Sequence, residues 1–179
     1  MKIYYVRHGQ TDFNLTKKMQ GGGTEKDLNE TGIMQANKTS EILKNAKYDI
    51  IICSPMNRAK QTAEIINKDK NIPIIIDERM RERKLGKFEG YPVTPDMEKQ
   101  IWDCNLNFDI PNGENLKEFK DRILGFIEDL KQKYDDKSIL VVAHGGIAKV
   151  LKAYYCKMPD SKNLSDIRME NCEILELNL

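Results

Sequence analysis

Short apolar runs alternate with amphipathic segments along the chain. Residues 3–6 and 49–53 are apolar runs of strand length, and residues 73–76 and 138–143 repeat the pattern. The tail at 173–177 alternates polar and apolar residues, as an edge strand does. These segments predict five strands.

Between the predicted strands, apolar residues recur at the intervals typical of a helix. We predict helices from position 29 onward, over about 57–67, through 116–130 and over 145–153, with a short one around 97–104. In the first and third of these, the apolar positions are Ile33, Ala36, Ile42 and Leu43, and Leu116, Phe119, Ile123, Phe126, Ile127 and Leu130.

Strands that alternate with helices favour an α/β fold. We predict a three-layer α/β/α sandwich with a mainly parallel central sheet and an edge strand. The 179 residues suit a single domain over 1–179, without a visible repeat or linker. Residues 77–115 are the least regular, and we expect them to roof a pocket. In such sheets, ligands bind outside the carboxyl ends of the strands.

Polar residues gather at those strand ends. His8 and His144 are the two histidines of the chain, and each follows a strand and precedes a glycine. Arg7 comes directly before His8, and Arg58 lies just beyond the second strand. Two guanidinium groups and two imidazoles suit a doubly charged tetrahedral anion, which backbone N–H groups at the glycines can approach. The sequence therefore predicts an anion site.

Composition narrows the choice of partners. The 29 basic residues nearly cancel the 28 acidic ones, so charge gives no argument for nucleic acid or an anionic membrane as partner. The apolar residues 3–6 are followed at once by Arg7 and His8, so they do not form the apolar region of a secretory signal. No apolar run approaches the length of a membrane span. The cysteines have neither disulfide-framework nor zinc-site spacing. We expect a cytoplasmic protein without metal or cofactor.

Five ordered motifs carry a family resemblance. They cover residues 7–21, 54–63, 80–90, 111–115 and 142–146, and include Arg7-His8-Gly9 and His144-Gly145-Gly146. Together they resemble the histidine phosphatase superfamily, also called phosphoglycerate-mutase-like, in its small phosphatase branch. A lone Arg-His-Gly is weak evidence, whereas five blocks in family order support one another.

The resemblance implies a function and a role for each site residue. The chain would be a metal-independent phosphatase of small phosphomonoesters, acting through a phosphohistidine at His8. Glu82 would protonate the leaving alcohol and then activate water. The phosphoryl group would be held by Arg7, Asn14, Arg58, His144 and Gly145. These roles agree with covalent catalysis and with charge stabilisation by a preorganised clamp.

The sequence departs from the family pattern at several positions. Gln10 stands where glutamate is commoner, and Asn115 replaces a serine. Five basic residues flank Glu82, either as a solvated loop or as a pocket wall for a second anionic group, and they could lower the pKa of Glu82. They are Arg79, Arg81, Arg83, Lys84 and Lys87. Tyr91, Trp102 and Phe108 of the roof could stack on a substrate or join the core.

Three other functions compete with the phosphatase interpretation. A cysteine phosphatase loop needs five residues between cysteine and arginine, and the stretch from Cys53 to Arg58 encloses four and contains Pro55. A mutase of the same family would carry longer shielding segments. A non-catalytic phosphate sensor would lack a residue such as His8 or Glu82. The physiological substrate and the oligomeric state stay open.

Overall fold

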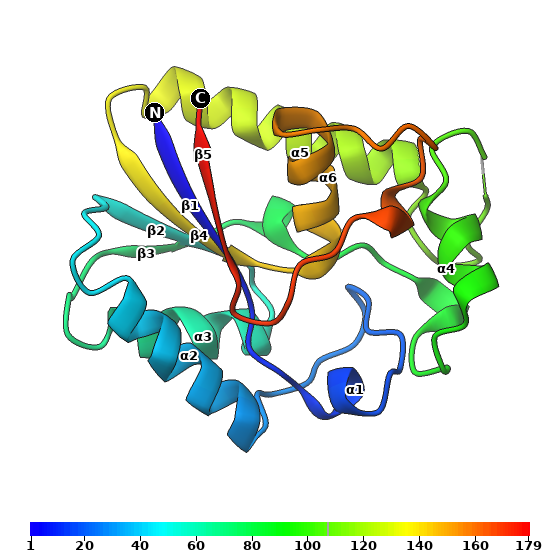
Figure 1. Ribbon diagram of the computed structural model, residues 1–179, viewed down its shortest axis with the longest axis horizontal. Helices are drawn as coiled ribbons and strands as arrows, with labels where there is room; N and C mark the ends of the chain where they lie inside the picture. Colours follow the sequence, from blue (N-terminus) through cyan, green and yellow to red (C-terminus); the bar gives the residue numbers. More distant parts are fainter. Residues whose placement is uncertain (107) are drawn as a thin grey trace.

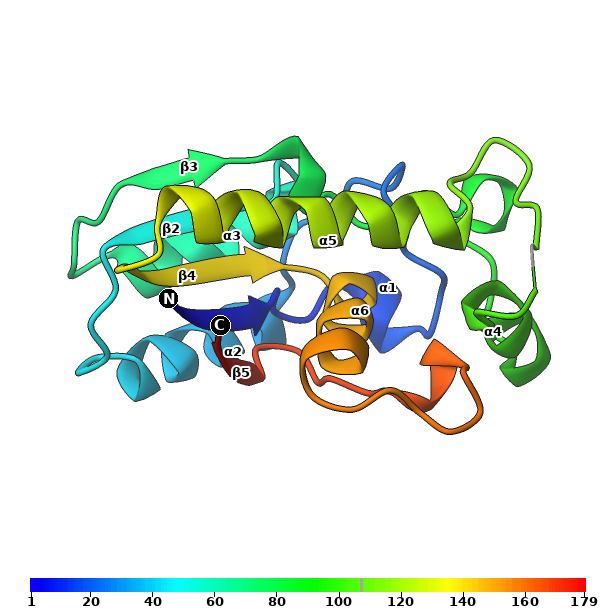
Figure 2. The ribbon, with the colours of Figure 1, turned by 90° about the horizontal axis from the view of Figure 1, so that it is seen from above.

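A computed structural model describes residues 1–106 and 108–179; position 107, within the expected roof, lies outside the described residues. Five strands form one sheet in the order β3-β2-β4-β1-β5 (Figures 1 and 2). They are β1 (Lys2–Arg7), β2 (Ile50–Cys53), β3 (Ile74–Ile76), β4 (Ser138–Ala143) and β5 (Ile174–Asn178). All pairs are parallel except β1 with β5, which confirms the mainly parallel sheet with an edge strand.

The helices lie close to their expected positions. They are α1 (Asp12–Leu15), α2 (Glu30–Ile42), α3 (Asn57–Asn67), α4 (Pro95–Trp102), α5 (Leu116–Lys133) and α6 (Gly145–Tyr155), with 3-10 turns at Glu78–Met80, Gly86–Phe88 and Leu164–Asp166. The short α1 falls in a stretch expected to be loop. A capping box between Thr11 and Asn14 stabilises it, because each side chain bonds to the other's backbone N–H.

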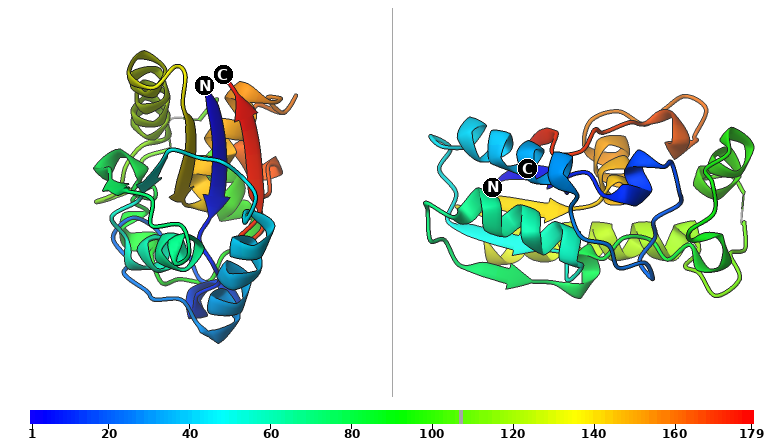
Figure 3. Two further views of the ribbon diagram at one scale, coloured as in Figure 1. Left: turned by 90° about the vertical axis from the view of Figure 1, so that its left-hand side faces the viewer. Right: turned by 90° about the horizontal axis from the view of Figure 1, so that it is seen from below.

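The three layers follow from the two buried faces of the sheet. On β1, Ile3 and Tyr5 pack into the cluster with α5 and α6, while Tyr4 and Val6 pack with the residues of α3. The end view in Figure 3 shows α2 and α3 on one side of the sheet and α5 and α6 on the other. The central strands are therefore buried on both faces, and this explains their unbroken apolar runs.

The two longest helices, α5 and α2, differ in how far their apolar residues are buried. On α5 the expected apolar face is confirmed, because its six residues are all buried. On α2 the helix forms as predicted, but two of its apolar residues, Ile33 and Ile42, are 45% and 61% exposed. The buried face of α2 consists of small and polar residues: Gly32, Ala36, Thr39 and Ser40. Small residues are needed there because Gly32 lies directly against the backbone after β1.

The carboxyl end of the sheet faces the irregular parts of the chain. Figure 2 shows α4 beyond the ends of the strands, and the loop after β1 curves toward it. In residues 1–106 and 108–179 no helix combines the length and the apolar character that crossing a membrane requires. The predicted binding end of the sheet is thus the end that these loops surround.

Candidate active site

The two histidines meet because their strands are neighbours. β1 and β4 pair in parallel with Arg7 opposite Ala143, so His8 and His144 leave the sheet at the same level. Their ring centroids are 5.2 Å apart, edge to face. The backbone N–H of His8 also donates to the carbonyl of Ala143 at 2.9 Å. The sheet itself therefore sets the distance between the two imidazoles.

The ring of His8 has a defined tautomer. Its Nδ1 lies 2.7 Å from the carbonyl oxygen of Gly9, which can only accept, so Nδ1 carries the proton. Burial, reinforced by the charges of Arg58 and Arg7, lowers the pKa of His8 well below its usual value. The ring is consequently neutral, and Nε2 keeps its lone pair.

The backbone around His8 is held from several elements. Asn171 donates to the His8 carbonyl at 2.9 Å, and Gly9 N–H donates to the Thr62 hydroxyl at 3.1 Å. A Cβ at Gly9 would lie 2.5 Å from the carbonyl oxygen of Gly32, so only glycine fits between β1 and α2. These contacts fix the direction in which His8 points.

Two buried N–H donors beside His8 have no partner among the described residues. Ser54 Oγ accepts from Met56 N–H, and among the described residues the one acceptor within reach of its own O–H is Nε2 of His144 at 2.6 Å. The buried hydroxyl therefore donates to Nε2, and the proton of His144 resides on Nδ1. That Nδ1 and the Nε of Arg7 are both buried without a hydrogen bond. Buried donors are rarely left unpaired, and an anion would satisfy both.

Asn14 and α6 add further donors. The Oδ1 of Asn14 accepts from the N–H and the hydroxyl of Thr11 at 3.0 and 3.1 Å, which leaves its amide NH₂ without a protein partner in the described chain. At the start of α6, His144 provides no side-chain cap. The N–H of Gly145 therefore points out of the helix with the positive end of its dipole.

Arg58 lies beneath these groups. It is fully buried and donates to the carbonyls of Thr24 and Gly21 at 2.8 and 3.4 Å. It also donates to the Gln20 amide oxygen at 3.0 Å when that amide is oriented so that its nitrogen donates to the Thr11 hydroxyl. Burial lowers the pKa of Arg58 to about 10, so it remains a cation at neutral pH. Its charge acts on both histidines, since it contributes to lowering the pKa of each.

Glu82 is buried on the other side of the site. Its two oxygens accept from the N–H groups of Arg83 and Gly146, each at 2.8 Å. Desolvation raises the pKa of Glu82, outweighing these two bonds and the charges of Arg58 and Arg7, which lower it. The expected weakening of this acid by basic neighbours is therefore outweighed by burial. A carboxyl with a raised pKa suits proton donation.

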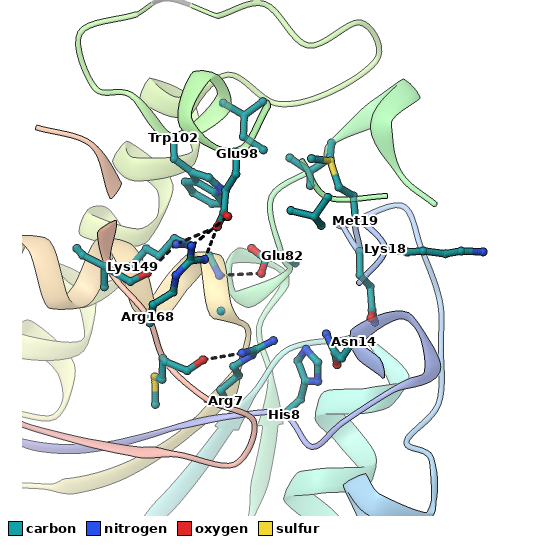
Figure 4. Close-up of a pocket in the computed structure, with 18 residues that line it drawn as sticks. Arg7, His8, Asn14, Lys18, Met19, Glu82, Glu98, Trp102, Lys149 and Arg168 are labelled. Carbon is teal, nitrogen blue, oxygen red and sulfur yellow. Dashed lines mark hydrogen bonds and ion pairs between the residues drawn. The ribbon is translucent and has the colours of Figure 1, made fainter. Parts of the chain in front are cut away.

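These groups surround one cavity of about 210 Å³ (Figure 4). It brings together five of the predicted site residues, whereas Arg58 and His144 are not among the residues that line it. The other lining residues come from the loop after β1, from the roof, from α6 and from a segment near the carboxyl terminus. The lining comprises Arg7, His8, Asn14, Lys18, Met19, Gln20, Glu82, Leu85, Val93, Glu98, Ile101, Trp102, Gly145, Gly146, Lys149, Ile167, Arg168 and Met169.

The basic residues that flank Glu82 do not line the cavity that contains His8, although Arg81 and Lys84 line a separate pocket on the other side of Glu82. Arg79 pairs with Asp77 and Asp129, and Arg81 pairs with Glu78. The expectation of a solvated loop also fails for Arg83, which is buried beneath Trp102 at 5.1 Å from the ring centroid. None of the five basic residues lines the cavity. Its distal bases are instead Lys18, Lys149 and Arg168.

Other residues singled out from the sequence have structural explanations. Asn115 caps α5, and Gln10 accepts from Asn29 at 3.1 Å. Cys53 is fully buried, which raises the pKa of its thiol to about 12. A phosphatase cysteine must be a thiolate, so this finding contradicts the cysteine phosphatase interpretation. Of the three roof aromatics, Trp102 lines the cavity, Phe108 packs on Phe88, and Tyr91 is exposed.

Sequence reasoning missed the carboxyl-terminal contribution to the site. Arg7 donates to the carbonyl of Met169 at 2.5 Å, and Arg168 and Lys149 line the distal cavity. It also missed Arg122 on α5, which pairs with Glu114 and donates to the carbonyl of Arg81 at 2.9 Å, one residue before Glu82. Of these residues, only Lys149 offered a local signal, because it lies on α6 about one turn after the two glycines that begin this helix. Within residues 1–106 and 108–179, no three His, Cys, Asp or Glu side chains cluster as metal ligands.

The comparison with known families agrees with the sequence motifs. Residues 3–179 match the profile of the histidine phosphatase superfamily (branch 1). A Bacillus subtilis (strain 168) phosphatase named PhoE, described as uncharacterized, is 42% identical over 149 residues. That alignment covers 83% of this chain and 74% of the relative.

Solved structures share the fold over nearly the whole chain. The α-ribazole phosphatase of Shigella flexneri has a TM-score of 0.84 at 26% identity, covering 100% of this chain and 91% of the other. A mycobacterial glucosyl-3-phosphoglycerate phosphatase in complex with VO₃ also has a TM-score of 0.84 at 26% identity, covering 99% and 92%. Two phosphatases with different named substrates thus resemble this chain equally well.

Proposed function

The chain belongs to the histidine phosphatase superfamily, and from this premise we propose that it hydrolyses small phosphomonoesters through a phosphohistidine at His8. The observation that carries the proposal is the state of His8. Its ring is neutral, its Nε2 is free, and unpartnered donors of Arg7 and His144 lie beside it. A nucleophile beside an unfilled set of anion donors suits phosphoryl transfer.

In the first step, Nε2 of His8 attacks phosphorus and the bond to the ester oxygen breaks. The protonated carboxyl of Glu82 gives its proton to the leaving oxygen, so an alcohol departs and Glu82 becomes a carboxylate. The nitrogen–phosphorus bond holds the phosphoryl group on His8. The hydrogen bond from Nδ1 to Gly9 stabilises the ring as positive charge develops on it.

In the second step, water reverses the roles. The Glu82 carboxylate takes a proton from water while the water oxygen bonds to phosphorus and the bond to Nε2 breaks. Inorganic phosphate leaves, and both His8 and Glu82 return to their starting states. One buried carboxyl can serve both steps because its raised pKa makes both forms accessible.

The clamp is proposed to comprise Arg7, Asn14, Arg58, His144 and Gly145. Arg7, Asn14, His144 and Gly145 offer N–H donors, and Arg58 supplies positive charge from beneath. This arrangement neutralises the equatorial oxygens with preorganised protein groups. We propose a small-metabolite substrate in the cytoplasm and a single domain over 1–179, since the four cysteines are free thiols and the strands share one sheet.

Trapping the covalent intermediate tests the proposal. Rapid quench with a radiolabelled phosphomonoester should leave label on the protein that is labile in acid and stable in base. His8→Ala should carry no label and should lose at least about a thousandfold in turnover, since the nucleophile is gone. Asn57→Ala, an exposed change on α3, is the matched control and should label normally.

Four results would reject the proposal. Acid-stable label contradicts a phosphohistidine, and label on His8→Ala contradicts the assigned nucleophile. Absence of turnover with any phosphomonoester supports the sensor alternative. Transfer of the label to a second metabolite in place of water supports the mutase alternative, which the same quench experiment detects in its product analysis.

A further inference from the structure

The cavity has a distal half that the reaction does not use. Away from His8 its walls are Leu85, Val93, Ile101 and Trp102, together with three charged groups from separate elements. Glu98 comes from α4, Lys149 from α6, and Arg168 from the segment after the Leu164–Asp166 turn. Figure 4 shows the three charged side chains converging above Arg7 and beside Glu82, while Lys18 points away from them.

These charges are unequal in number. Arg168 holds Glu98 through two parallel bonds of 2.6 and 3.2 Å, and Lys149 lies 3.6 Å from the same carboxylate. Two cations thus share one anion. Glu170 and Asp166 also act on Arg168, but neither lines the cavity, so the two cations outnumber the single carboxylate only among the distal lining residues.

Lys149 contributes positive charge to the cavity and has no free N–H to donate to a ligand. Its ammonium donates to the carbonyls of Leu164 and Ile167 at 3.0 and 2.7 Å, and its remaining N–H faces Glu98. Burial lowers the pKa of Lys149 to about 8, which marks a cation that its surroundings solvate poorly. A further anion nearby would stabilise its charged form.

Arg168 has donors to spare. A guanidinium carries five N–H groups, and Glu98 occupies two of them, so three remain without a protein partner in residues 1–106 and 108–179. The side chain is 66% exposed while lining the cavity. Its present partner is a carboxylate held fork to fork, the geometry that guanidinium and carboxylate prefer. The guanidinium of Arg168 can therefore donate to a second carboxylate from the N–H groups that Glu98 does not use.

The size of the cavity limits what can reach Arg168. At about 210 Å³ it is smaller than sites for drug-sized ligands, which span roughly 300–1,000 Å³. Trp102 closes it near Glu82, since a Cβ on Gly146 would lie 2.8 Å from the edge of the indole ring. A compact, short-chain molecule fits between the phosphate donors and Arg168.

We propose that Arg168, held by Glu98 and supported by the charge of Lys149, selects short phosphomonoesters that carry a carboxylate. The inference rests on the proposed phosphatase function and adds its substrate class. Arg168 is a specificity-determining residue in this account, and Glu98 is a positioning residue that also competes with the substrate for the guanidinium.

A matched pair of substrates tests this inference. 3-Phosphoglycerate and glycerol 1-phosphate have the same three-carbon body and differ in a carboxylate or a hydroxymethyl group. Wild type should favour 3-phosphoglycerate in kcat/KM by about 10- to 100-fold, the scale of one hydrogen bond to a charged group. Arg168→Gln should bring that ratio toward one, mainly through KM.

Two further variants separate recognition from structure. Glu98→Gln should raise the ratio, because it removes the competing anion, whereas a purely structural ion pair would make it fall as in Arg168→Gln. Lys157→Gln removes an exposed positive charge outside the cavity and should keep the wild-type ratio. Loss of the ratio in Lys157→Gln would point to bulk charge and overturn the proposal.

The outcomes distinguish the inference from the function beneath it. Equal turnover of both substrates by wild type overturns the carboxylate preference and leaves the phosphatase standing. An equal loss on both substrates in Arg168→Gln also overturns it. Absence of turnover on either substrate and on nitrophenyl phosphate overturns the phosphatase function and the inference together.

Discussion

The two ends of the cavity are built in different ways. At the phosphate end, His8, Arg58 and His144 are buried, and backbone groups of the sheet and its loops hold most of them. At the distal end, side chains of α4, α6 and a loop segment hold one another by ion pairs, and Arg168 is largely exposed. The first arrangement is part of the core, while the second lies on top of it.

This difference separates reaction from recognition. Under the proposed mechanism, changing a residue at the phosphate end should disturb both catalysis and packing, because the same groups serve both. Changing Glu98 or Arg168 alters the charge that a substrate meets and leaves the sheet untouched. Substrate choice can therefore vary on a constant catalytic frame, which agrees with the different named substrates of the two similar structures.

The largest loss of rate that tests the contrast between the two ends of the cavity is expected at Glu82. Glu82→Gln should slow cleavage of alkyl phosphates by roughly 100- to 10,000-fold, because an alkoxide needs a proton in the transition state. Nitrophenyl phosphate leaves as a stabilised anion and should be cleaved nearly normally in the first step. Slow dephosphorylation should then produce a burst of nitrophenol in stopped-flow absorbance.

Glu89 is the matched control for that experiment. Its Oε1 accepts from Gly23 N–H and Leu85 N–H at 3.1 and 3.0 Å, and its Oε2 accepts from the Thr24 hydroxyl, so Glu89 holds the loops together. Glu89→Gln should show no burst. Equal loss on both substrate types in Glu82→Gln, without a burst, would assign Glu82 a structural role only.

A smaller effect is expected at Arg58, whose charge supports the site although Arg58 is not among the residues that line the cavity. Arg58→Ala should cost about 3 kcal/mol of transition-state stabilisation, or roughly 150-fold in kcat/KM. Arg58→Lys keeps the charge and should recover part of this loss. Circular dichroism and a thermal melt check the fold of both variants. Full activity in folded Arg58→Ala would remove Arg58 from the clamp.

The pH profile tests the two buried titrating groups together. Because the pKa of His8 is lowered, its ring stays neutral to acidic pH; because the pKa of Glu82 is raised, its proton is retained above the usual range. For alkyl phosphates, kcat/KM should fall as pH rises through the Glu82 pKa, by tenfold per unit beyond it. Nitrophenyl phosphate should lack most of this decline in the phosphorylation step. An identical decline for both substrates would contradict the assignment.

The smallest effects are expected in the free energy of unfolding, which should differ between variants at the phosphate end and at the distal end of the cavity. Ser54→Ala leaves the buried Nε2 of His144 unpartnered and should lower the free energy of unfolding by about 1–3 kcal/mol. Arg168→Gln removes a largely exposed arginine from a mostly buried Glu98, which keeps Lys149 as a partner, so the free energy of unfolding should change by about 0–1 kcal/mol. Urea titration measures both. Equal losses would show that the distal ion pair is as much a part of the core as the histidine network.

The sequence by itself determined the local and repetitive features of this protein. Apolar runs located the strands, helical spacing located α5, and glycines after two strand ends marked His8 and His144. These predictions succeed because the physics that produces them acts over a few residues. A buried strand must be apolar, and a backbone that approaches an anion needs glycine.

Only the tertiary structure decided which surfaces and charges meet. Ile33 and Ile42 are apolar but exposed, because α2 buries its small residues where the loop after β1 approaches it closely. Arg83 reads as solvated but lies under Trp102, and Glu98, Lys149 and Arg168 converge from three separate elements. Such contacts depend on how elements far apart in the sequence pack against each other, and no pattern of neighbouring residues encodes that arrangement.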